Sequence, residues 1–155
     1  MTRQITGILI TALCLMLSCN HDVVYDQYQS AGSEGWTWQD TKEFEVDITD
    51  TVSLHNLYIQ VRHTLEYPMS NLYMFVRIEG PSGQTMTDTV NVFLAYPDGK
   101  WIGSGIGKLK ELSLLYRKHT VFAQPGRYRF MLEQGMRSPE IPVTDVGIRI
   151  EKQQP

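Results

Sequence analysis

Apolar and polar residues alternate along much of the chain with a period of two. Residues 43–48, with the sequence EFEVDI, give the clearest example, because every second side chain is apolar. The same alternation recurs in residues 57–62, 72–79 and 146–151. This period is typical of a β-strand that buries one face and exposes the other. We therefore expect these four segments to be strands.

Further strands are expected where Thr, Val and aromatic residues gather, in residues 85–96, 112–116 and 128–132. Turn-forming residues punctuate the pattern at 80–83, 97–99 and 124–126. About seven strands and no convincing amphipathic helix predict an all-β fold, a single antiparallel β-sandwich domain over residues 36–155. Only residues 108–113 could form a short helical turn.

The first 18 residues interrupt the alternation. They begin with one positive charge, at Arg3, and continue at 5–17 with an uncharged, mostly apolar run of 13 residues. This combination is typical of a secretory signal peptide, and the run is shorter than the roughly 18 residues that a membrane-spanning helix needs. Residues 15–19, LMLSC, resemble a bacterial lipobox, in which a signal peptidase cleaves before a lipidated cysteine. We predict a signal peptide at 1–18 and acylation of Cys19.

Cysteine usage and the segment after the signal agree with this assignment. Only Cys14 and Cys19 occur, so cleavage and acylation would leave the mature domain no thiol for a disulfide or a metal site. Residues 19–35 are polar and end in a Ser/Gly-rich stretch, which predicts a lipidated tether. No second apolar segment is long enough to span a bilayer, so we expect lipid alone to anchor the protein to a membrane.

The charge balance excludes some classes of partner. The whole chain has a net charge of −3, and loss of Arg3 with the signal leaves 13 basic and 17 acidic side chains, a net charge of −4. Nucleic-acid binding normally needs a basic surplus, so we expect no nucleic-acid partner and no electrostatic adhesion to anionic lipid. Charges on the strands oppose the apolar faces, which favours a solvated surface with cross-strand ion pairs. An anion-binding row of arginines is the alternative.

Neither the histidines nor the acidic residues indicate a reaction centre. The histidines are His21, His55, His63 and His119. On one straight strand His55 and His63 would lie about 26 Å apart, too far to share an ion, so we expect surface histidines and no metal. The acidic residues of 43–48 could frame a glycosidic bond, but their alternation is ordinary for an outward strand face.

The glycine-rich segment 103–108, GSGIGK, fails the tests for two catalytic loops. A nucleophile elbow needs glycine at 102 and 106, and both positions are isoleucine. A phosphate-binding loop needs glycine at 102 and Ser or Thr at 109, which is leucine. We predict no enzyme activity and no cofactor.

Tryptophan and glycine residues give the best candidates for a binding surface. Trp36 and Trp38 are two positions apart, so an extended chain would point both the same way. Trp101 is followed by glycine at 103, 105 and 107, which leaves one face bare for something to pack on. Internal packing is one interpretation, and a sugar or peptide platform is the other. Residues 97–108 form the first candidate partner-binding loop, and the candidate ligand- or partner-binding residues are Trp36, Trp38, Trp101, Gly103 and Gly105.

Taken together, these residues resemble the GldH family of gliding-motility lipoproteins from Bacteroidetes-type bacteria. The matching features, in order, are Cys19, Trp36, the segment 67–72, Asp88-Thr89, Ala95, Pro97, Gly99, Trp101, Gly103, Gly105, Phe122, Gly126, Tyr128, the segment 133–137 and the segment 145–147. The resemblance implies an exported lipoprotein associated with gliding machinery, without assigned enzyme activity, in a family that also occurs in bacteria that do not glide. It carries over no site residue except Cys19. For Gln134 and Arg137 we favour a structural role over a contact site.

Two functions follow from these features. The favoured one is a non-enzymatic outer-membrane lipoprotein that supports cell-envelope, gliding or secretion-associated machinery through protein–protein contacts. The alternative is a glycan- or peptidoglycan-binding module that uses exposed tryptophans.

Residues 20–23, NHDV, contain one acid, whereas surface lipoproteins of such bacteria usually carry adjacent acids after the cysteine. We therefore expect the periplasmic face of the outer membrane.

Overall fold

The computed structural model describes residues 22–153, and within this range the fold is all-β with no helix. Ten strands follow one another along the chain: β1 (Val23–Ser30), β2 (Trp36–Thr37), β3 (Lys42–Ile48), β4 (His55–Thr64), β5 (Asn71–Glu79), β6 (Thr85–Phe93), β7 (Leu109–Thr120), β8 (Gly126–Gln134), β9 (Glu140–Ile141) and β10 (Val143–Lys152). Each of the seven strands expected from the sequence is present, so the predicted all-β sandwich is confirmed.

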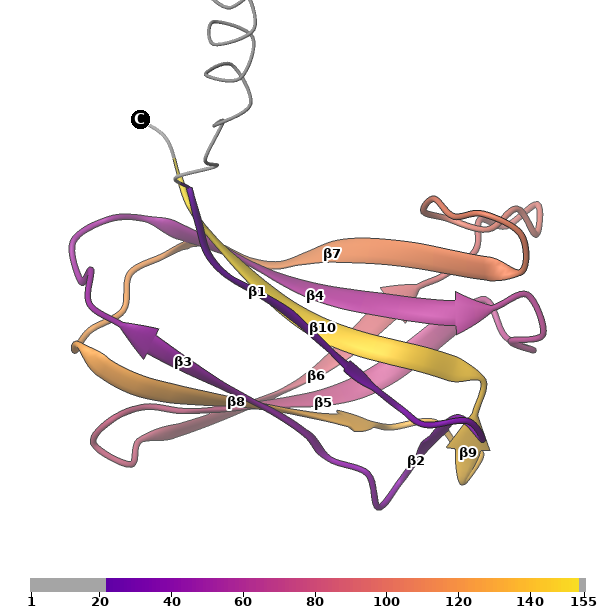
Figure 1. Ribbon diagram of the computed structural model, residues 1–155, viewed down its shortest axis with the longest axis horizontal. Coiled ribbons are helices and arrows are strands. Elements are labelled where there is room, and N and C mark those ends of the chain that lie inside the picture. The colour runs from indigo at the N-terminus through magenta and orange to yellow at the C-terminus, as the bar shows by residue number, and fades with distance from the viewer. Residues whose placement is uncertain (1–21, 154–155) are drawn as a thin grey trace, which may run out of the picture.

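Two four-stranded sheets pack face to face, as Figure 1 shows. The first sheet has the strand order β1-β10-β4-β7 and the second has the order β3-β8-β5-β6, while β2 and β9 form a separate short pair. Every pairing is antiparallel. Strands that are neighbours in a sheet are therefore mostly far apart in sequence, which is typical of a β-sandwich.

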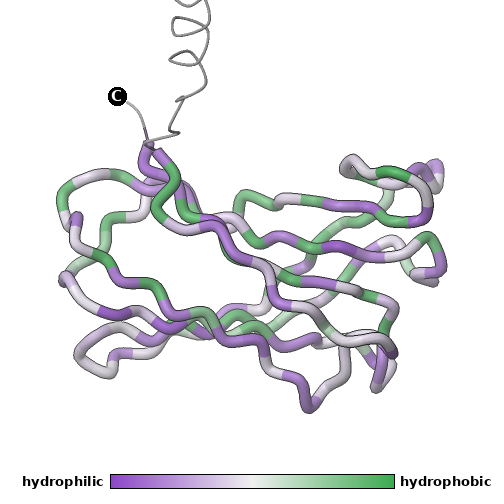
Figure 2. Tube along the Cα trace, in the orientation of Figure 1, coloured by the Kyte–Doolittle hydropathy of each residue, from purple (hydrophilic) through white to green (hydrophobic). Residues whose placement is uncertain are grey.

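Alternation of side chains builds the core between the two sheets. In β3 the buried apolar residues are Phe44, Val46 and Ile48, and the residues between them are exposed. β5 repeats this pattern, and the change of hydropathy from residue to residue along the strands is visible in Figure 2. The inward faces of β4 and β10 supply apolar residues from the opposite sheet. Burial of these faces is the main force that holds the sheets together.

Residues 23–30 depart from the sequence prediction. We expected 19–35 to be a tether, but this segment forms β1, which pairs with β10 from Val23↔Glu151 to Ser30↔Asp145. The buried Lys42 fixes the end of this strand, because its Nζ donates to the carbonyl oxygen of Ser30 at 2.7 Å. A strand at a sheet edge buries less of its surface, so its polar composition hid it. The predicted signal peptide and Cys19 lie outside the described residues.

The helical turn considered for residues 108–113 is absent, because residues 109–113 belong to the long strand β7. This strand pairs with β4 along its whole length, for example at Gln60↔Ser113 and His63↔Lys110. Its N-terminal half also bonds to the glycine-rich segment, through an isolated bridge between Ser104 and Glu111. The extended form satisfies these backbone groups on both sides, which a helical turn could not do.

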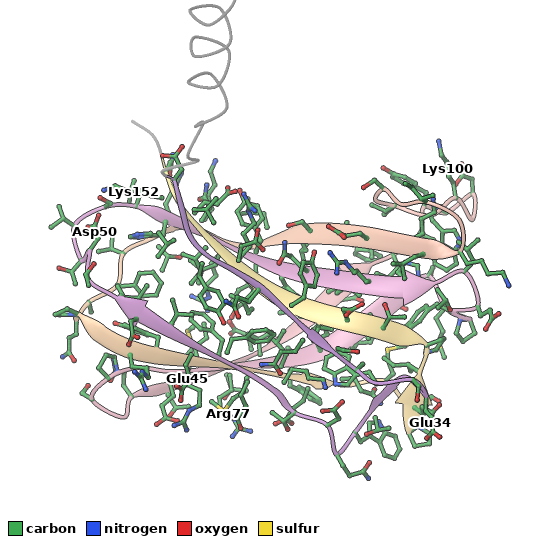
Figure 3. The ribbon with its side chains drawn as sticks, in the orientation of Figure 1. Glu34, Glu45, Asp50, Arg77, Lys100 and Lys152 are labelled. Atoms are coloured by element: carbon green, nitrogen blue, oxygen red, sulfur yellow. The ribbon has the colours of Figure 1, made fainter. Side chains whose placement is uncertain are left out.

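The sandwich has two distinct ends. We call the end at which the described chain starts the near end. There β1 begins, β10 ends, and the loops 49–54, 80–84 and 121–125 connect the strands. At the far end lie the loops 31–35, 65–70 and 94–108, together with the segment between β8 and β10. Figure 3 places Asp50 and Lys152 at the near end and Lys100 at the far end. The candidate loop 97–108 is therefore remote from the start of the folded domain.

Candidate partner-binding site

Trp36 is a core residue. Its side chain has 0% exposure, and its indole N–H donates to the carbonyl oxygen of Asp40 at 2.7 Å. It belongs to the main hydrophobic cluster between the sheets. A ring in this position cannot stack on a ligand, so the sequence-based assignment of Trp36 to a binding surface is wrong.

Trp38, by contrast, lies at the surface with 46% exposure. Its indole N–H donates to the carbonyl oxygen of Met136 at 2.8 Å, which fixes the ring against the segment after β8. The prediction that Trp36 and Trp38 point the same way is wrong, because β2 ends at Thr37 and the extended geometry does not continue. One indole is consequently buried and the other is presented to the solvent.

Trp101 packs against the core rather than standing free. The half-buried indole lies 4.7 Å, centre to centre, from the imidazole of His63, which also contacts the ring of Tyr67 at 5.6 Å. Burial lowers the pKa of His63, although the Nδ1 contact to the carbonyl oxygen of Thr64 at 2.9 Å opposes this effect. His55 is likewise buried, against Phe122. The expectation of surface histidines is therefore wrong for these two residues, and His21 lies outside the described residues.

Gly103 and Gly105 allow the candidate loop to lie directly on β7. A Cβ on Gly103 would stand 2.1 Å from the carbonyl oxygen of Glu111, and one on Gly105 would stand 2.1 Å from that of Leu109. Gly103 also has a φ of +91°, which favours glycine. The backbone of β7 thus occupies the bare glycine face, so internal packing is the observed arrangement. These glycines shape the loop and leave no room there for a flat ligand.

The loop 97–108 nevertheless presents an exposed apolar side chain. Ser104 and Glu111 exchange two backbone hydrogen bonds of 3.0 and 2.7 Å, which fasten the loop to β7. Beyond this anchor Ile106 projects with 95% exposure, and Tyr96 is exposed where the loop begins. A fastened loop that carries exposed apolar groups is suited to a protein contact.

A larger apolar surface lies on the outer face of the second sheet. Tyr73 and Phe75 point outward from β5, and Phe93 of β6 pairs with Asn71, so it is the diagonal neighbour of Tyr73. The side chain of Phe75 lies over Gly135, and the sulfur of Met136 contacts the backbone N–H of Tyr73. Met136 also binds Trp38. We call the exposed residues Trp38, Tyr73, Phe75 and Phe93 the aromatic patch.

Sequence reasoning missed three members of the aromatic patch, although a signal was present. Tyr73 and Phe75 occupy the outward positions of a clearly alternating strand, where polar residues are usual. Aromatic residues at consecutive outward positions therefore indicate an exposed apolar face. The contribution of Phe93 depends on the β5–β6 register and could not be seen from one strand.

Charged residues on the strand faces form ion pairs rather than an anion site. Arg127 of β8 bonds to Glu45 at 3.3 Å and to Asp47 at 3.1 Å, and Arg129 bonds to Glu79 at 3.5 Å. Figure 3 shows Glu45 and Arg77 on the outer side of the second sheet. The predicted cross-strand ion pairs are confirmed. The carboxylates of Glu45 and Asp47 share the guanidinium group of Arg127 instead of flanking a cleft. Within residues 22–153, no group of three His, Cys, Asp or Glu side chains is placed to hold a metal.

An apolar pocket of about 230 Å³ opens at the near end, between the two sheets. Its lining includes Ile78, Met86, Val121, Phe122 and Tyr128, with Arg117 at one side. Arg117 bonds to Asp88 across the sheets at 2.6 Å, and Tyr116 donates to the same carboxylate. These two bonds hold the pKa of Asp88 below its usual value, while burial, aided by Asp88, raises the pKa of Tyr116 to about 12. The trio ties β6 to β7.

Gln134 has the structural role that we favoured. Its side chain is buried, its amide group donates to the carbonyl oxygen of Ser138 at 2.9 Å, and its amide oxygen accepts from the backbone N–H of Met136 at 2.9 Å. These bonds shape the segment on which Trp38 and Phe75 rest. Arg137 lies at the surface next to this segment. The support beneath the aromatic patch is therefore well fixed.

No helix within the described part of the chain is long and apolar enough to cross a membrane.

Comparison with known proteins places the sequence in a family. The family model described as GldH lipoprotein matches residues 23–150. The gliding motility lipoprotein GldH of Flavobacterium johnsoniae is 37% identical over 155 aligned positions, which cover 95% of this chain and 96% of that protein. A gliding motility lipoprotein GldH homolog of Christiangramia forsetii is 34% identical, covering 94% and 93% of the two chains. The chain belongs to the GldH lipoprotein family, which confirms the resemblance read from its sequence.

Proposed function

We propose that this protein is a non-enzymatic envelope lipoprotein that supports gliding or secretion-associated machinery by binding another protein through the aromatic patch. Family membership supports the link to gliding motility and to a lipid anchor. The observation that carries the proposal is the gathering of three exposed aromatic side chains on the outer face of β5 and β6, with the exposed Trp38 joined to this face through Met136. Exposed aromatic clusters are unusual on proteins without a partner and are enriched in interface centres.

The anchor in this proposal is an acylated Cys19 in the outer membrane, with the domain in the periplasm. The cysteine follows an apolar run of signal-peptide length, and only one acid follows it in residues 20–23. Mass spectrometry of the mature N-terminus tests acylation. Protease treatment of intact cells tests orientation, since loss of the domain from unlysed cells would contradict a periplasmic location.

A protein partner fits the patch better than a glycan does. Protein interfaces combine several aromatic side chains around a centre and a polar rim, and the ion pairs of β3 and β8 lie farther along the same face. A glycan platform would rely on exposed tryptophans, but Trp36 is buried and Trp101 is packed on His63. Only Trp38 keeps an exposed ring for stacking on a sugar.

A crosslinking experiment with a matched control tests the proposal. Phe75→Ser and Phe93→Ser remove exposed rings and leave the core unchanged, so both variants should fold. Leu115→Ser removes a comparably exposed apolar side chain from β7, in the other sheet. We expect envelope proteins crosslinked to the natural chain and to Leu115→Ser to be lost from the double Phe variant. Equal recovery from all three chains would rule out the patch as the contact.

The glycan alternative predicts a different result. Trp38→Ala should then abolish co-sedimentation of the lipoprotein with purified peptidoglycan sacculi, while the Phe75→Ser and Phe93→Ser variants should still sediment. Failure of the natural chain to sediment with sacculi would remove this alternative.

A further inference from the structure

The folded domain begins very close to the proposed lipid attachment. Only three residue steps separate Cys19 from Asp22, the first described residue, and β1 begins at Val23. Even a fully extended chain covers only about 3.3–3.6 Å per residue, so the start of the domain lies no more than roughly 10 Å from the acylated cysteine. This step rests on the acylation of Cys19 proposed above. A leash this short cannot lift the near end of the sandwich away from the lipid.

The loop 49–54 is joined to the start of the domain through the end of β10. The backbone N–H of Lys152 donates to the carbonyl oxygen of Asp22 at 2.6 Å, and that of Gln153 donates to Leu54 at 2.7 Å. The Nζ of Lys152 forms an ion pair with Asp50 at 2.8 Å. Figure 3 shows Asp50 and Lys152 together beside the beginning of β1. Whatever surface holds the lipid anchor therefore lies next to this loop.

Apolar side chains project from the near end. Val52 has 86% exposure, and Leu54, Val121 and Val24 are also exposed. The loop presents Val52 in a fixed turn, because Asp50 accepts hydrogen bonds from the backbone N–H groups of Val52 and Ser53 at 3.0 and 2.9 Å. The bond to Lys152 and these backbone bonds lower the pKa of Asp50. An exposed valine on a rigid turn is thus built into the loop.

Val121 extends this apolar surface toward the second loop of the near end. His55, which follows Leu54, pairs with Thr120 across β4 and β7, so Leu54 and Val121 flank one strand pair. Val121 also lines the apolar pocket between the sheets. Two neighbouring loops therefore present apolar groups on the side of the molecule where the chain enters.

We propose that Val52, Leu54 and Val121 form a membrane seat, which dips into the interfacial region of the bilayer that holds the acyl chains of Cys19. Apolar side chains gain free energy by leaving water for this region, and attachment by lipid removes most of the entropic cost of bringing them there. The neighbouring charges, Asp50 and Lys152, neutralise one another, so the seat needs no anionic lipid.

The seat fixes the orientation of the whole domain. Since the near end rests on lipid, the loop 97–108 at the opposite end of the sandwich faces away from the membrane. Trp38 and Phe93 of the aromatic patch also belong to that far half, because they lie next to the ends of β2 and β6. The lipid anchor at Cys19 and the membrane seat together would thus present the loop 97–108 and the aromatic patch to a partner in the adjacent compartment.

Fluorescence of single-site labels on the full lipidated protein tests the seat. Acylation consumes Cys19 and the signal removes Cys14, so a cysteine introduced by Val52→Cys or Val121→Cys is the only free thiol. Each variant is labelled with an environment-sensitive dye and reconstituted into vesicles of phosphatidylethanolamine and phosphatidylglycerol. Ile106→Cys is the matched control, since Ile106 is as exposed as Val52 but lies at the far end.

We expect labels at 52 and 121 to show blue-shifted emission and to be quenched by lipid-attached nitroxide, while the label at 106 responds only to a water-soluble quencher. Labels that all respond as in water, on a chain whose acylation is verified by mass spectrometry, would overturn the seat and leave the lipid anchor intact. A chain that lacks acyl groups at Cys19 would overturn both the seat and the proposed anchor.

Discussion

The indole of Trp101 covers the imidazole of His63, with 4.7 Å between the two ring centres. His63 is fully buried on β4, whereas Trp101 lies beyond β6 at the base of the far loop. The Nε2 atom of His63 has no hydrogen-bond partner among residues 22–153. The packing of these two rings therefore joins the loop 97–108 to the core. It also places the ionisable imidazole of His63 where a charge is costly.

Trp101→Ala should destabilise the fold. Truncation of buried aromatic residues costs about 3–5 kcal/mol, and the partial exposure of Trp101 lowers our expectation to about 2–3 kcal/mol. Urea unfolding followed by circular dichroism measures the change. Trp38→Ala is the control, because it removes an exposed ring and one hydrogen bond and should cost about 1 kcal/mol. Equal losses in the two variants would contradict the packing role of Trp101.

His63 should make stability depend on pH. Since burial lowers its pKa in the folded state, the unfolded chain binds more protons once the pH falls below the ordinary value of 6.5. The free energy of unfolding is therefore unaffected by His63 above that value, and it decreases as the pH falls toward the lower pKa of the folded state. Each unit of difference between the two pKa values contributes about 1.4 kcal/mol.

The matching experiment compares unfolding between pH 7.5 and pH 5 in three chains. His63→Phe keeps an aromatic ring against Trp101 and Tyr67 but cannot titrate, so the decrease in stability should become smaller. His119→Asn is the control for loss of a histidine: it removes an exposed imidazole, and asparagine tolerates the φ of +57° at this position. An unchanged pH dependence in His63→Phe would show that other groups cause it.

The alternating strands could be predicted from the sequence because their burial depends on neighbours of any kind. Phe44, Val46 and Ile48 face the core whichever strand lies opposite, so a period of two was sufficient. β1 could not be recognised, because an edge strand with the sequence VVYDQYQS buries little of either face. The different fates of Trp36 and Trp38 depend on where a two-residue strand ends, which alternation does not determine. The aromatic patch similarly needed the β5–β6 register.

Gly103→Ala should disrupt the loop 97–108. The new methyl group would meet the carbonyl oxygen of Glu111 at 2.1 Å, in a backbone with φ of +91°, so the loop must shift away from β7. We expect a loss of more than about 2 kcal/mol in the free energy of unfolding. Gly107→Ala is the control, because it has a positive φ of +67° but no atom within 4 Å, and backbone strain alone should cost about 1 kcal/mol.

Deletion of residues 22–30 distinguishes a strand from a tether. If the segment were only a leash, a soluble domain that begins at residue 31 would be as stable as one that begins at residue 22. β1 instead covers the edge of β10, Tyr25 packs on the core, and Ser30 accepts the hydrogen bond of the buried Lys42. We expect the shorter domain to lose more than about 3 kcal/mol and to aggregate through the bare β10 edge. Thermal unfolding and light scattering of the two domains measure this, and matching melting temperatures would refute the structural role of β1.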